Sequence, residues 1–196
     1  SYVKENAYGG LLYFADGTVS GNKVLLSGGT VSGQAAGGMS FLGDAVEVSG
    51  NEITVTGGTI EEGVYGGLAQ LGGNASGNTV TISGGTINKY VYGGSADSGT
   101  ASNNTVNIYG GTFKSDTRLY GGFSDDSSGN TLNFYTKGIT VDKLGYFQNL
   151  SFYVPEDTTA GETILTVTST ADVSGASIRA SVYDSMKMSP GDTITL

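Results

Sequence analysis

A glycine pair recurs along the first three quarters of the chain at a nearly constant spacing. The pair occupies positions 9–10, 37–38, 66–67, 93–94 and 121–122, so successive copies are 27 to 29 residues apart. A Gly-Gly-Thr sequence follows each of the first four pairs, and a degenerate copy follows the fifth. A fixed period of this size is the signature of a solenoid, in which each repeat packs only on its neighbours.

A single asparagine follows each glycine pair and opens the most regular part of the repeat. These asparagines are Asn22, Asn51, Asn78, Asn104 and Asn130. Glycine accepts a positive φ without a steric penalty, and asparagine tolerates the same backbone region. We therefore expect both glycine pairs of each unit to lie at turns, and the asparagines to form a stacked polar ladder at a corner.

Each unit contains a run in which apolar and polar residues alternate. In the clearest copy, Val80 and Ile82 alternate with Thr79, Thr81 and Ser83. This period of two is that of a β-strand, whose successive side chains point to opposite faces. Applied to every unit, the pattern predicts a core made of Val24, Leu26, Ile53, Val55, Ile60, Val64, Val80, Ile82, Ile87, Val91, Val106, Ile108, Phe113, Leu119, Leu132, Phe134 and Ile139.

These patterns predict an all-β protein, a right-handed parallel β-helix of about five rungs of about 27–28 residues each. The repeats span residues 1–145. Residues 146–196 have no Gly-Gly pair and form a non-repetitive β segment that caps or continues the helix. Such an end segment would cover backbone groups that the last rung leaves unpaired.

Composition excludes several classes of function. The chain has no Cys and no His, which excludes thiolate metal sites, His-based triads and ordinary zinc hydrolases. A net charge of −9 disfavours nucleic acid and anionic membrane surfaces as partners. The sequence has no apolar run long enough for a spanning helix, so we expect no membrane insertion by this fragment.

The segments between each glycine pair and the next asparagine vary most in length and composition. The first two, 11–21 and 39–50, are apolar enough at their start to suggest an extra short strand, whereas the later three are small and polar. Variable segments of a solenoid gather along one side. A ligand is therefore expected along that side.

The repeats resemble the glycine-rich β-helical passengers of autotransporter adhesins, which have a pectin-lyase-like β-helix. Residues 77–87, Gly-Asn-Thr-Val-Thr-Ile-Ser-Gly-Gly-Thr-Ile, are the clearest copy. Residues 152–155, 160–167 and 190–196 are similar to the segment such passengers carry before their outer-membrane barrel. The resemblance implies export to the cell surface and non-covalent attachment to a host or bacterial surface protein or glycan. It also implies a monomer without a cofactor.

Enzymatic activity is the alternative, because pectate lyases and related polysaccharide-cleaving enzymes share this scaffold. Hydrolysis needs paired carboxylates, and lyase chemistry on acidic sugars needs Lys or Arg together with calcium. The repeat loops offer one acidic pair, Asp125 and Asp126, and their basic residues form no row. We therefore expect no enzymatic activity, and keep a pectate-lyase-like enzyme as the alternative.

Two sets of side chains are candidates for ligand binding. Tyr8, Tyr65, Tyr92 and Tyr120 recur at one position of the unit, where they either stack on one another or offer their rings to sugars. Asp97, Asp125 and Asp126 lie in variable loops, as solvated turn acids or as calcium ligands. The outward threonines form a partial row, as on ice-binding solenoids, at Thr79, Thr81, Thr105 and Thr131. The row is interrupted by Glu52, Asn107, Asn133 and Tyr135. The candidate site residues are Tyr65, Tyr92, Tyr120, Asp97, Asp125 and Asp126, with no metal site predicted.

Overall fold

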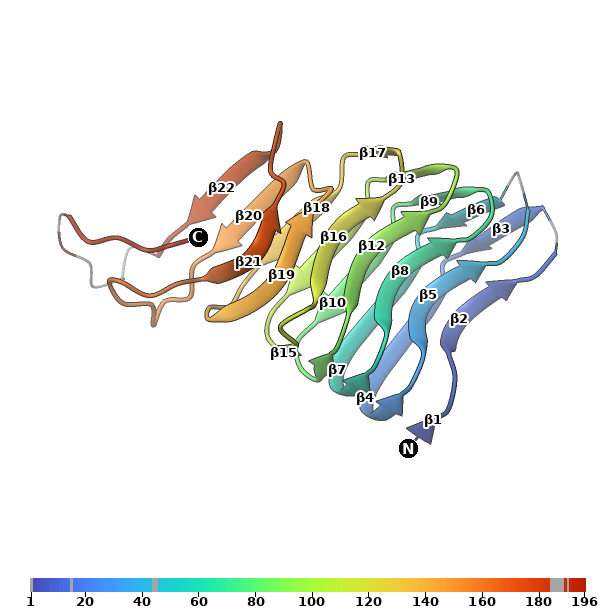
Figure 1. Ribbon diagram of the computed structural model, residues 1–196, viewed down its shortest axis with the longest axis horizontal. Helices are drawn as coiled ribbons and strands as arrows, with labels where there is room; N and C mark the ends of the chain where they lie inside the picture. The colour runs from blue at the N-terminus through green and yellow to red at the C-terminus, as the bar shows by residue number, and fades with distance from the viewer. Residues whose placement is uncertain (1, 15, 44–45, 184–188, 190) are drawn as a thin grey trace.

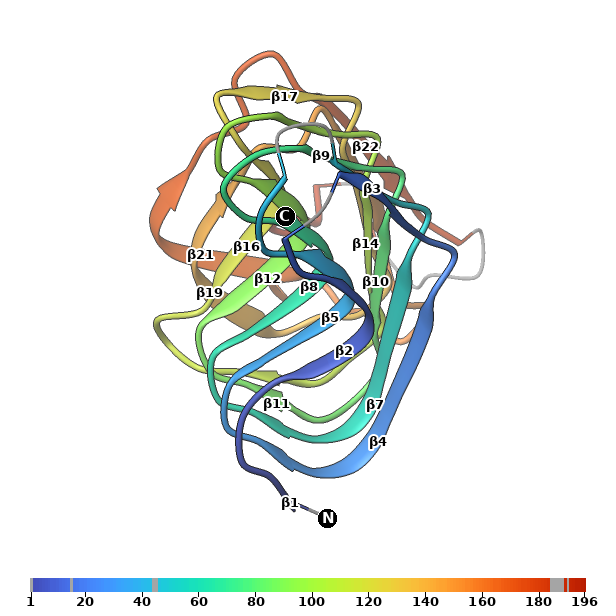
Figure 2. The same ribbon diagram turned by 90° about the vertical axis from the view of Figure 1, so that its right-hand side faces the viewer.

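The chain forms a β-solenoid of about seven turns in the computed structural model, which describes residues 2–14, 16–43, 46–183, 189 and 191–196 (Figure 1). The described residues contain no helix, and neighbouring strands pair in parallel. Viewed from the N-terminal end, the chain winds clockwise as it recedes from the viewer (Figure 2). The coil is therefore right-handed, as the sequence predicts.

Three parallel sheets form the walls of the solenoid. Sheet A contains, in order, β1 (Tyr2–Val3), β4 (Lys23–Val31), β7 (Glu52–Ile60), β10 (Thr79–Ile82), β14 (Thr105–Ile108), β18 (Thr131–Phe134), β20 (Asn149–Tyr153) and β22 (Ser177–Ser181). The short strands β11 (Thr86–Ile87) and β15 (Thr112–Phe113) belong to the same sheet. Sheet B contains β2 (Ala7–Leu12), β5 (Gln34–Ser40), β8 (Gly63–Ala69), β12 (Tyr90–Ala96), β16 (Arg118–Phe123), β19 (Ile139–Gly145) and β21 (Leu165–Ala171). Sheet C contains β3 (Gly17–Ser20), β6 (Val46–Ser49), β9 (Asn74–Ser76), β13 (Thr100–Ser102) and β17 (Asp126–Ser128).

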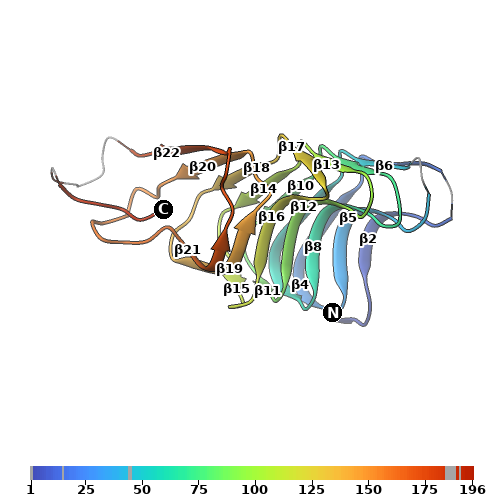
Figure 3. The same ribbon diagram turned by 45° about the horizontal axis from the view of Figure 1, so that its top comes forward.

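The register places equivalent residues of successive units side by side. Thr79 pairs with Thr105 and Val80 with Val106, and the same offset continues into the next turn. Equivalent faces therefore stack along the solenoid axis, one turn after another (Figure 3).

The rung count from the sequence, about five, is too low. Sheet B has seven strands, because β19 and β21 continue it after the last glycine pair. Leu150 and Phe152 of β20 pair with Leu132 and Phe134 of the fifth unit, and β22 then pairs with β20. β20 keeps the alternation of a half-buried strand, but none of the strands from β19 to β22 has a glycine pair, which is why the glycine marker missed these turns.

The interior of the solenoid holds the predicted core. Thirteen predicted residues are buried in one cluster between sheets A and B: Ile53, Val55, Ile60, Val64, Val80, Ile82, Ile87, Val91, Val106, Ile108, Leu119, Leu132 and Phe134. The remaining predicted residues, Val24, Leu26, Phe113 and Ile139, pack partly buried against this cluster. Like side chains therefore stack on like, as the repeats require.

A second, smaller core lies between sheet C and the ends of the sheet B strands. It contains Val46, Val48, Ala69, Ala75, Ala96 and Ala101, among others. Sheet C has a strand in each of the five glycine-pair units, although the sequence suggested an extra strand only in the first two. The later three strands are short. β9 and β13 each bury a single alanine and β17 buries no residue, whereas the earlier strands bury valines. Because these segments are small and polar, the sequence does not predict strands there.

The asparagines form a continuous hydrogen-bonded ladder inside the corner between sheets C and A. Asn78 donates through its backbone N to Asn104 Oδ1 at 3.0 Å and through its side-chain Nδ2 to the same oxygen at 3.1 Å. Its Nδ2 also donates to the Val48 carbonyl at 2.8 Å. The pattern repeats from Asn22 onward, and Gln148 Oε1 accepts the last bond, from Asn130 N. The predicted asparagine ladder is confirmed.

The first glycine pair of each unit does not lie at a turn, which corrects the sequence-based expectation. Gly66 and Gly67 lie inside β8, and their φ angles fall outside the left-handed region. A Cβ on Gly67 would stand 2.6 Å from Cγ of Asn78, and one on Gly38 would stand 2.6 Å from Nδ2 of Asn51. Real Cβ contacts under 3.0 Å essentially do not occur. These glycines are therefore required by the close approach of the asparagine ladder.

The glycine pair also interrupts the alternation of side chains along each sheet B strand. Val64 faces the main core, whereas Tyr65 and Leu68 belong together to a cluster on the outer face, and Ala69 joins the small core. Two outward residues three positions apart break the period of two. The strand is therefore kinked at the pair, where it comes close to the asparagine ladder.

Positive φ is concentrated at two other rows of the unit. The residue before each ladder asparagine has φ of 67, 61, 62, 55 and 67°, and the fourth of these is Asn103 in place of glycine. The second glycine of each Gly-Gly-Thr has a positive φ as well, for example 90° at Gly58. At these rows the expected role of glycine is confirmed.

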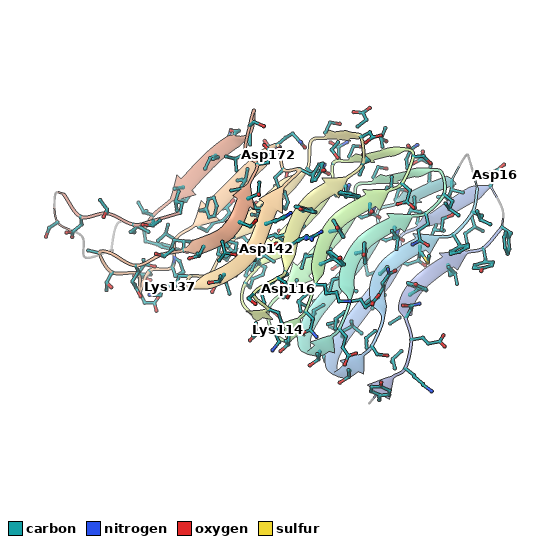
Figure 4. All side chains as sticks on the ribbon, in the orientation of Figure 1. Asp16, Lys114, Asp116, Lys137, Asp142 and Asp172 are labelled. Carbon is teal, nitrogen blue, oxygen red and sulfur yellow. The ribbon has the colours of Figure 1, made fainter. Side chains whose placement is uncertain are left out.

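Lys137 ties the loop before β21 to the end of the fifth unit (Figure 4). Its Nζ lies 2.9 Å from Glu162 Oε2 and 3.5 Å from Asp157 Oδ1. It also donates to the Asp157 carbonyl at 2.9 Å. The Thr159 backbone amide and Lys137 lower the pKa of Glu162, so this carboxylate contacts both the backbone of its own loop and Lys137.

Candidate functional site

The recurring tyrosines form a ladder on the outer face of sheet B. Tyr65 and Tyr92 are paired in register, and their ring centroids are 5.1 Å apart at an interplanar angle of 28°. Tyr92 and Tyr120 follow at 5.4 Å and 43°, and Tyr8 packs against the same cluster. In the second turn Ala36 takes the tyrosine position.

The ladder tyrosines have little free surface, although they point away from the main core. Tyr65 is 6% exposed and Tyr92 is 8% exposed. Tyr90 stacks on Tyr92 at 5.6 Å and helps to cover the ladder. Desolvation by this burial raises the pKa of both Tyr65 and Tyr92, and the neighbouring phenols add to the effect. The ring faces of the two residues are therefore occupied by one another and by Tyr90.

The three candidate aspartates are exposed and lie in the variable segments. Asp97 follows β12, Asp125 precedes β17, and Asp126 is the first residue of β17. Asp125 lines a polar hollow of about 210 Å³ together with Asp172, Gln148 and serines. No group of three or more acidic residues that could hold a metal ion occurs in the part of the chain that the structure describes.

A larger hollow, which we call the aromatic hollow, opens on the outer side of sheet B near the first three turns. Its volume is about 520 Å³. The residues that line it are Glu5, Asn6, Tyr8, Leu11, Tyr13, Gln34, Met39, Phe41, Glu62 and Gln70. Half of them come from the variable segments of the first three units, on the side where the sequence places a ligand. Tyr8 and Leu11 of β2 and Gln34 and Met39 of β5 form the part of its wall that belongs to sheet B.

Tyr13 and Phe41 form a stacked aromatic pair in the wall of the aromatic hollow. Their rings stack at a centroid distance of 4.8 Å and an interplanar angle of 13°. Tyr13 is 54% exposed, in contrast to the ladder tyrosines. Carboxamides of Asn6, Gln34 and Gln70 line the same hollow, and the Gln34 backbone N donates to Asn6 Oδ1 at 2.8 Å.

The hollow combines aromatic faces, carboxamides and negative charge. Glu5 and Glu62 are the charged side chains among the described residues that line it, and Glu62 is paired with Lys89 at 3.3 Å. Of these lining residues, only Tyr8 is predicted from the sequence as a member of the recurring tyrosines. The apolar starts of the first two variable segments were the available signal, but they were interpreted as an extra strand and not as the wall of a hollow.

Comparison with known proteins gives no relative for this chain. No protein-family model, no curated protein and no solved structure matches it. Among the described residues, no helix is long and apolar enough to cross a membrane.

Proposed function

We propose that this chain is an adhesive segment of a bacterial surface protein, of the autotransporter-passenger type that its repeats resemble. In this proposal the protein is exported across the outer membrane, and the solenoid acts as a rod that holds its partner without covalent chemistry. The observation that carries the proposal is the aromatic hollow, to which the non-repeating segments contribute half of the lining residues on one side of an otherwise repetitive rod.

The chemistry of the hollow favours a neutral glycan over an anionic ligand. Tyr13 and Phe41 present an apolar face of the kind that sugar rings stack on, and Gln34 and Gln70 supply donors and acceptors for hydroxyl groups. The charged residues that line it are acidic, so a phosphate or a uronic acid would be repelled. A surface protein carrying such glycans would present the same groups.

Weak contacts suffice for attachment by such a protein. Many copies on one cell engage many sugar chains at once, and effective concentration multiplies the separate affinities. A stiff rod contributes by holding the hollow at a fixed place relative to the cell. The rod needs no catalytic group for this task.

A binding assay with neutral oligosaccharides immobilised on a surface tests the proposal. We expect the fragment to be retained, and Tyr13→Ser to weaken retention by about tenfold, which corresponds to about 1.4 kcal/mol. Tyr109→Ser is the matched control, because Tyr109 is 50% exposed and directly follows β14 of sheet A, away from the hollow. Absence of retention, or equal retention by Tyr13→Ser and the wild-type chain, would contradict the proposal.

A second assay distinguishes the adhesive proposal from the alternative of a polysaccharide-cleaving enzyme. Acidic polysaccharides are incubated with the chain, and the release of short products is followed. Release that disappears when Asp125 and Asp126 are both replaced by Asn would establish the enzyme and overturn the adhesive proposal. The adhesive proposal predicts no release by either protein.

A further inference from the structure

Three tyrosines form a regular column at the edge of sheet A that the sequence repeats did not reveal. Tyr109 and Tyr135 stack with ring centroids 4.3 Å apart and an interplanar angle of 3°. Tyr135 and Tyr153 stack in the same way, at 4.4 Å and 8°. We call Tyr109, Tyr135 and Tyr153 the tyrosine column.

The column follows from the strand register of three successive turns. Ile108 pairs with Phe134, and Phe134 with Phe152, so the tyrosine after each of them occupies the same position. Tyr109 N donates to the Ile82 carbonyl at 2.8 Å, and Tyr135 N donates to the Ile108 carbonyl at 2.8 Å. Because the hydrogen-bonded ladder continues through these residues, their rings are held at the spacing between turns.

The column is accessible from solvent. Tyr109 is 50% exposed, and Tyr135 and Tyr153 are half-buried. The register ends the column at serine on its C-terminal side, where Tyr153 pairs with Ser181. Burial, with charge interactions and hydrogen bonding from Tyr109 and Tyr153 as further causes, raises the pKa of Tyr135 to about 12.

Two parallel phenols at this separation are arranged for oxidative coupling. Successive turns are related by a shift along the axis, so each ring atom lies next to its counterpart in the neighbouring turn. The ortho carbons of a phenoxyl radical carry unpaired electron density and form carbon–carbon bonds with one another. Neither ring has to travel across the surface to meet its partner.

We propose that the tyrosine column is a site of oxidative cross-linking, in which dityrosine bonds join successive turns of the solenoid. The oxidant is hydrogen peroxide acting through a haem peroxidase. Each of two phenols loses one electron and one proton, and the two radicals form a bond between their ortho carbons. The two ortho hydrogens then move to the oxygen atoms and restore both phenols. Hydrogen peroxide takes up the two electrons and two protons and leaves as two molecules of water.

Other tyrosines of the chain lack one of the two requirements. Tyr65 and Tyr92 stack at 5.1 Å but are 6% and 8% exposed. Tyr13 is 54% exposed, but the ring stacked on it belongs to Phe41, which has no phenol oxygen. Tyr120 and Tyr146 meet edge to face at 79°. Among these tyrosines, near-parallel phenols of which neither is buried occur only in the column.

A dilute solution of the full chain, treated with hydrogen peroxide and a haem peroxidase, tests the proposal. The monomer is isolated after the reaction under denaturing conditions, digested with trypsin and analysed by mass spectrometry. Cleavage after Lys114, Lys137 and Lys143 separates the three column tyrosines into different peptides. We expect the peptides 90–114 and 119–137 to be joined with a loss of two hydrogen atoms, and fragmentation to place the bond at Tyr109 and Tyr135. A link from Tyr135 to Tyr153 is the other expected product.

Phenylalanine variants keep the stacking and remove the chemistry. Tyr135→Phe is expected to abolish dityrosine fluorescence in the monomer, and so is the double variant Tyr109→Phe with Tyr153→Phe. Tyr13→Phe, the control with similar exposure, is expected to retain it. A monomer that shows no loss of hydrogen, links at other tyrosines, or fluorescence that survives Tyr135→Phe would overturn the proposal.

Cross-linking also predicts a change in stability that mere oxidation of single tyrosines would not produce. A covalent bond between turns restricts the unfolded chain, as a disulfide does. The cross-linked monomer is therefore expected to unfold at a higher temperature than the untreated protein. Treated Tyr135→Phe is expected to unfold at the same temperature as untreated Tyr135→Phe, and a rise there would contradict the assignment.

Discussion

Cγ of Asn78 lies 2.6 Å from the point where a Cβ on Gly67 would stand. The glycine of a sheet B strand and the asparagine of the following corner therefore share one close contact inside the same turn. The contact recurs at Gly10 with Asn22 and at Gly38 with Asn51. This explains why the glycine pair and the asparagine repeat together, although variable residues separate them.

Gly67→Ala is expected to destabilise the protein because the added methyl group has no space beside the buried Asn78 amide. Overpacking of this kind typically costs roughly 1–3 kcal/mol. Gly28→Ala is the control, because Gly28 also lies in a solenoid strand but a Cβ there meets no atom within 4 Å. Urea unfolding followed by circular dichroism measures both variants. Equal stability of the two variants would contradict the close-contact explanation.

Asn78→Ala is expected to be more damaging than the loss of one exposed hydrogen bond. Asn78 is 0% exposed, and its removal leaves the Asn51 N and Nδ2 groups and the Val48 carbonyl without these partners. Each buried unpaired group costs about 1–3 kcal/mol, so we expect a loss of at least about 3 kcal/mol. Asn133→Ala removes a similar amide bond, to Asn107 at 2.9 Å, from the half-buried outer face of sheet A. Its cost is expected to be about 1 kcal/mol or less, and a cost equal to that of Asn78→Ala would exclude a special role for the ladder.

Stability is expected to fall in alkaline solution as the stacked tyrosines ionise. Burial raises the pKa of Tyr65 and Tyr92, and burial together with its stacked neighbours raises that of Tyr135 to about 12. In the unfolded chain tyrosine ionises near pH ~10, so the unfolded state releases its protons first. The stabilising contribution is therefore fully present below pH ~10 and is lost as pH rises toward ~12.

The alkaline prediction is checked by the urea midpoint measured between pH 8 and pH 12. Tyr65→Phe cannot ionise at this position and is expected to reduce the pH dependence of the midpoint. Tyr2→Phe changes a tyrosine that is 66% exposed and should leave the dependence unaltered. A wild-type midpoint that stays constant to pH 12 would show that these phenols titrate normally.

Much of the architecture could be predicted from the sequence because the repeats report the core directly. Val80 and Ile82 alternate with threonines, and a solenoid is the arrangement that buries such a face in every unit. The last two turns were left out of the rung count because β19 to β22 have no glycine pairs, although a β segment that caps or continues the helix was expected there. The role of those pairs was misjudged because spacing alone does not distinguish a glycine needed for φ from one needed for space.

The candidate site was harder to predict, because it depends on which faces the kinked strands expose. Tyr65 and Tyr92 recur clearly in the sequence, yet neighbouring rings cover them. Tyr13 and Phe41 do not repeat in later units, and only the stacked turns bring them together. The tyrosine column was missed for a related reason, because Tyr135 was interpreted as an interruption of a threonine row.

The asparagine ladder can be observed directly by hydrogen exchange of side-chain amides in the isotopically labelled protein, measured by nuclear magnetic resonance. We predict that the Nδ2 protons of Asn51, Asn78 and Asn104 exchange far more slowly than those of Asn107 and Asn133, which lie on the outer face. Slow exchange of the first three amides would show that the ladder is a buried and stably hydrogen-bonded part of each turn. Equally fast exchange of all five would contradict the account.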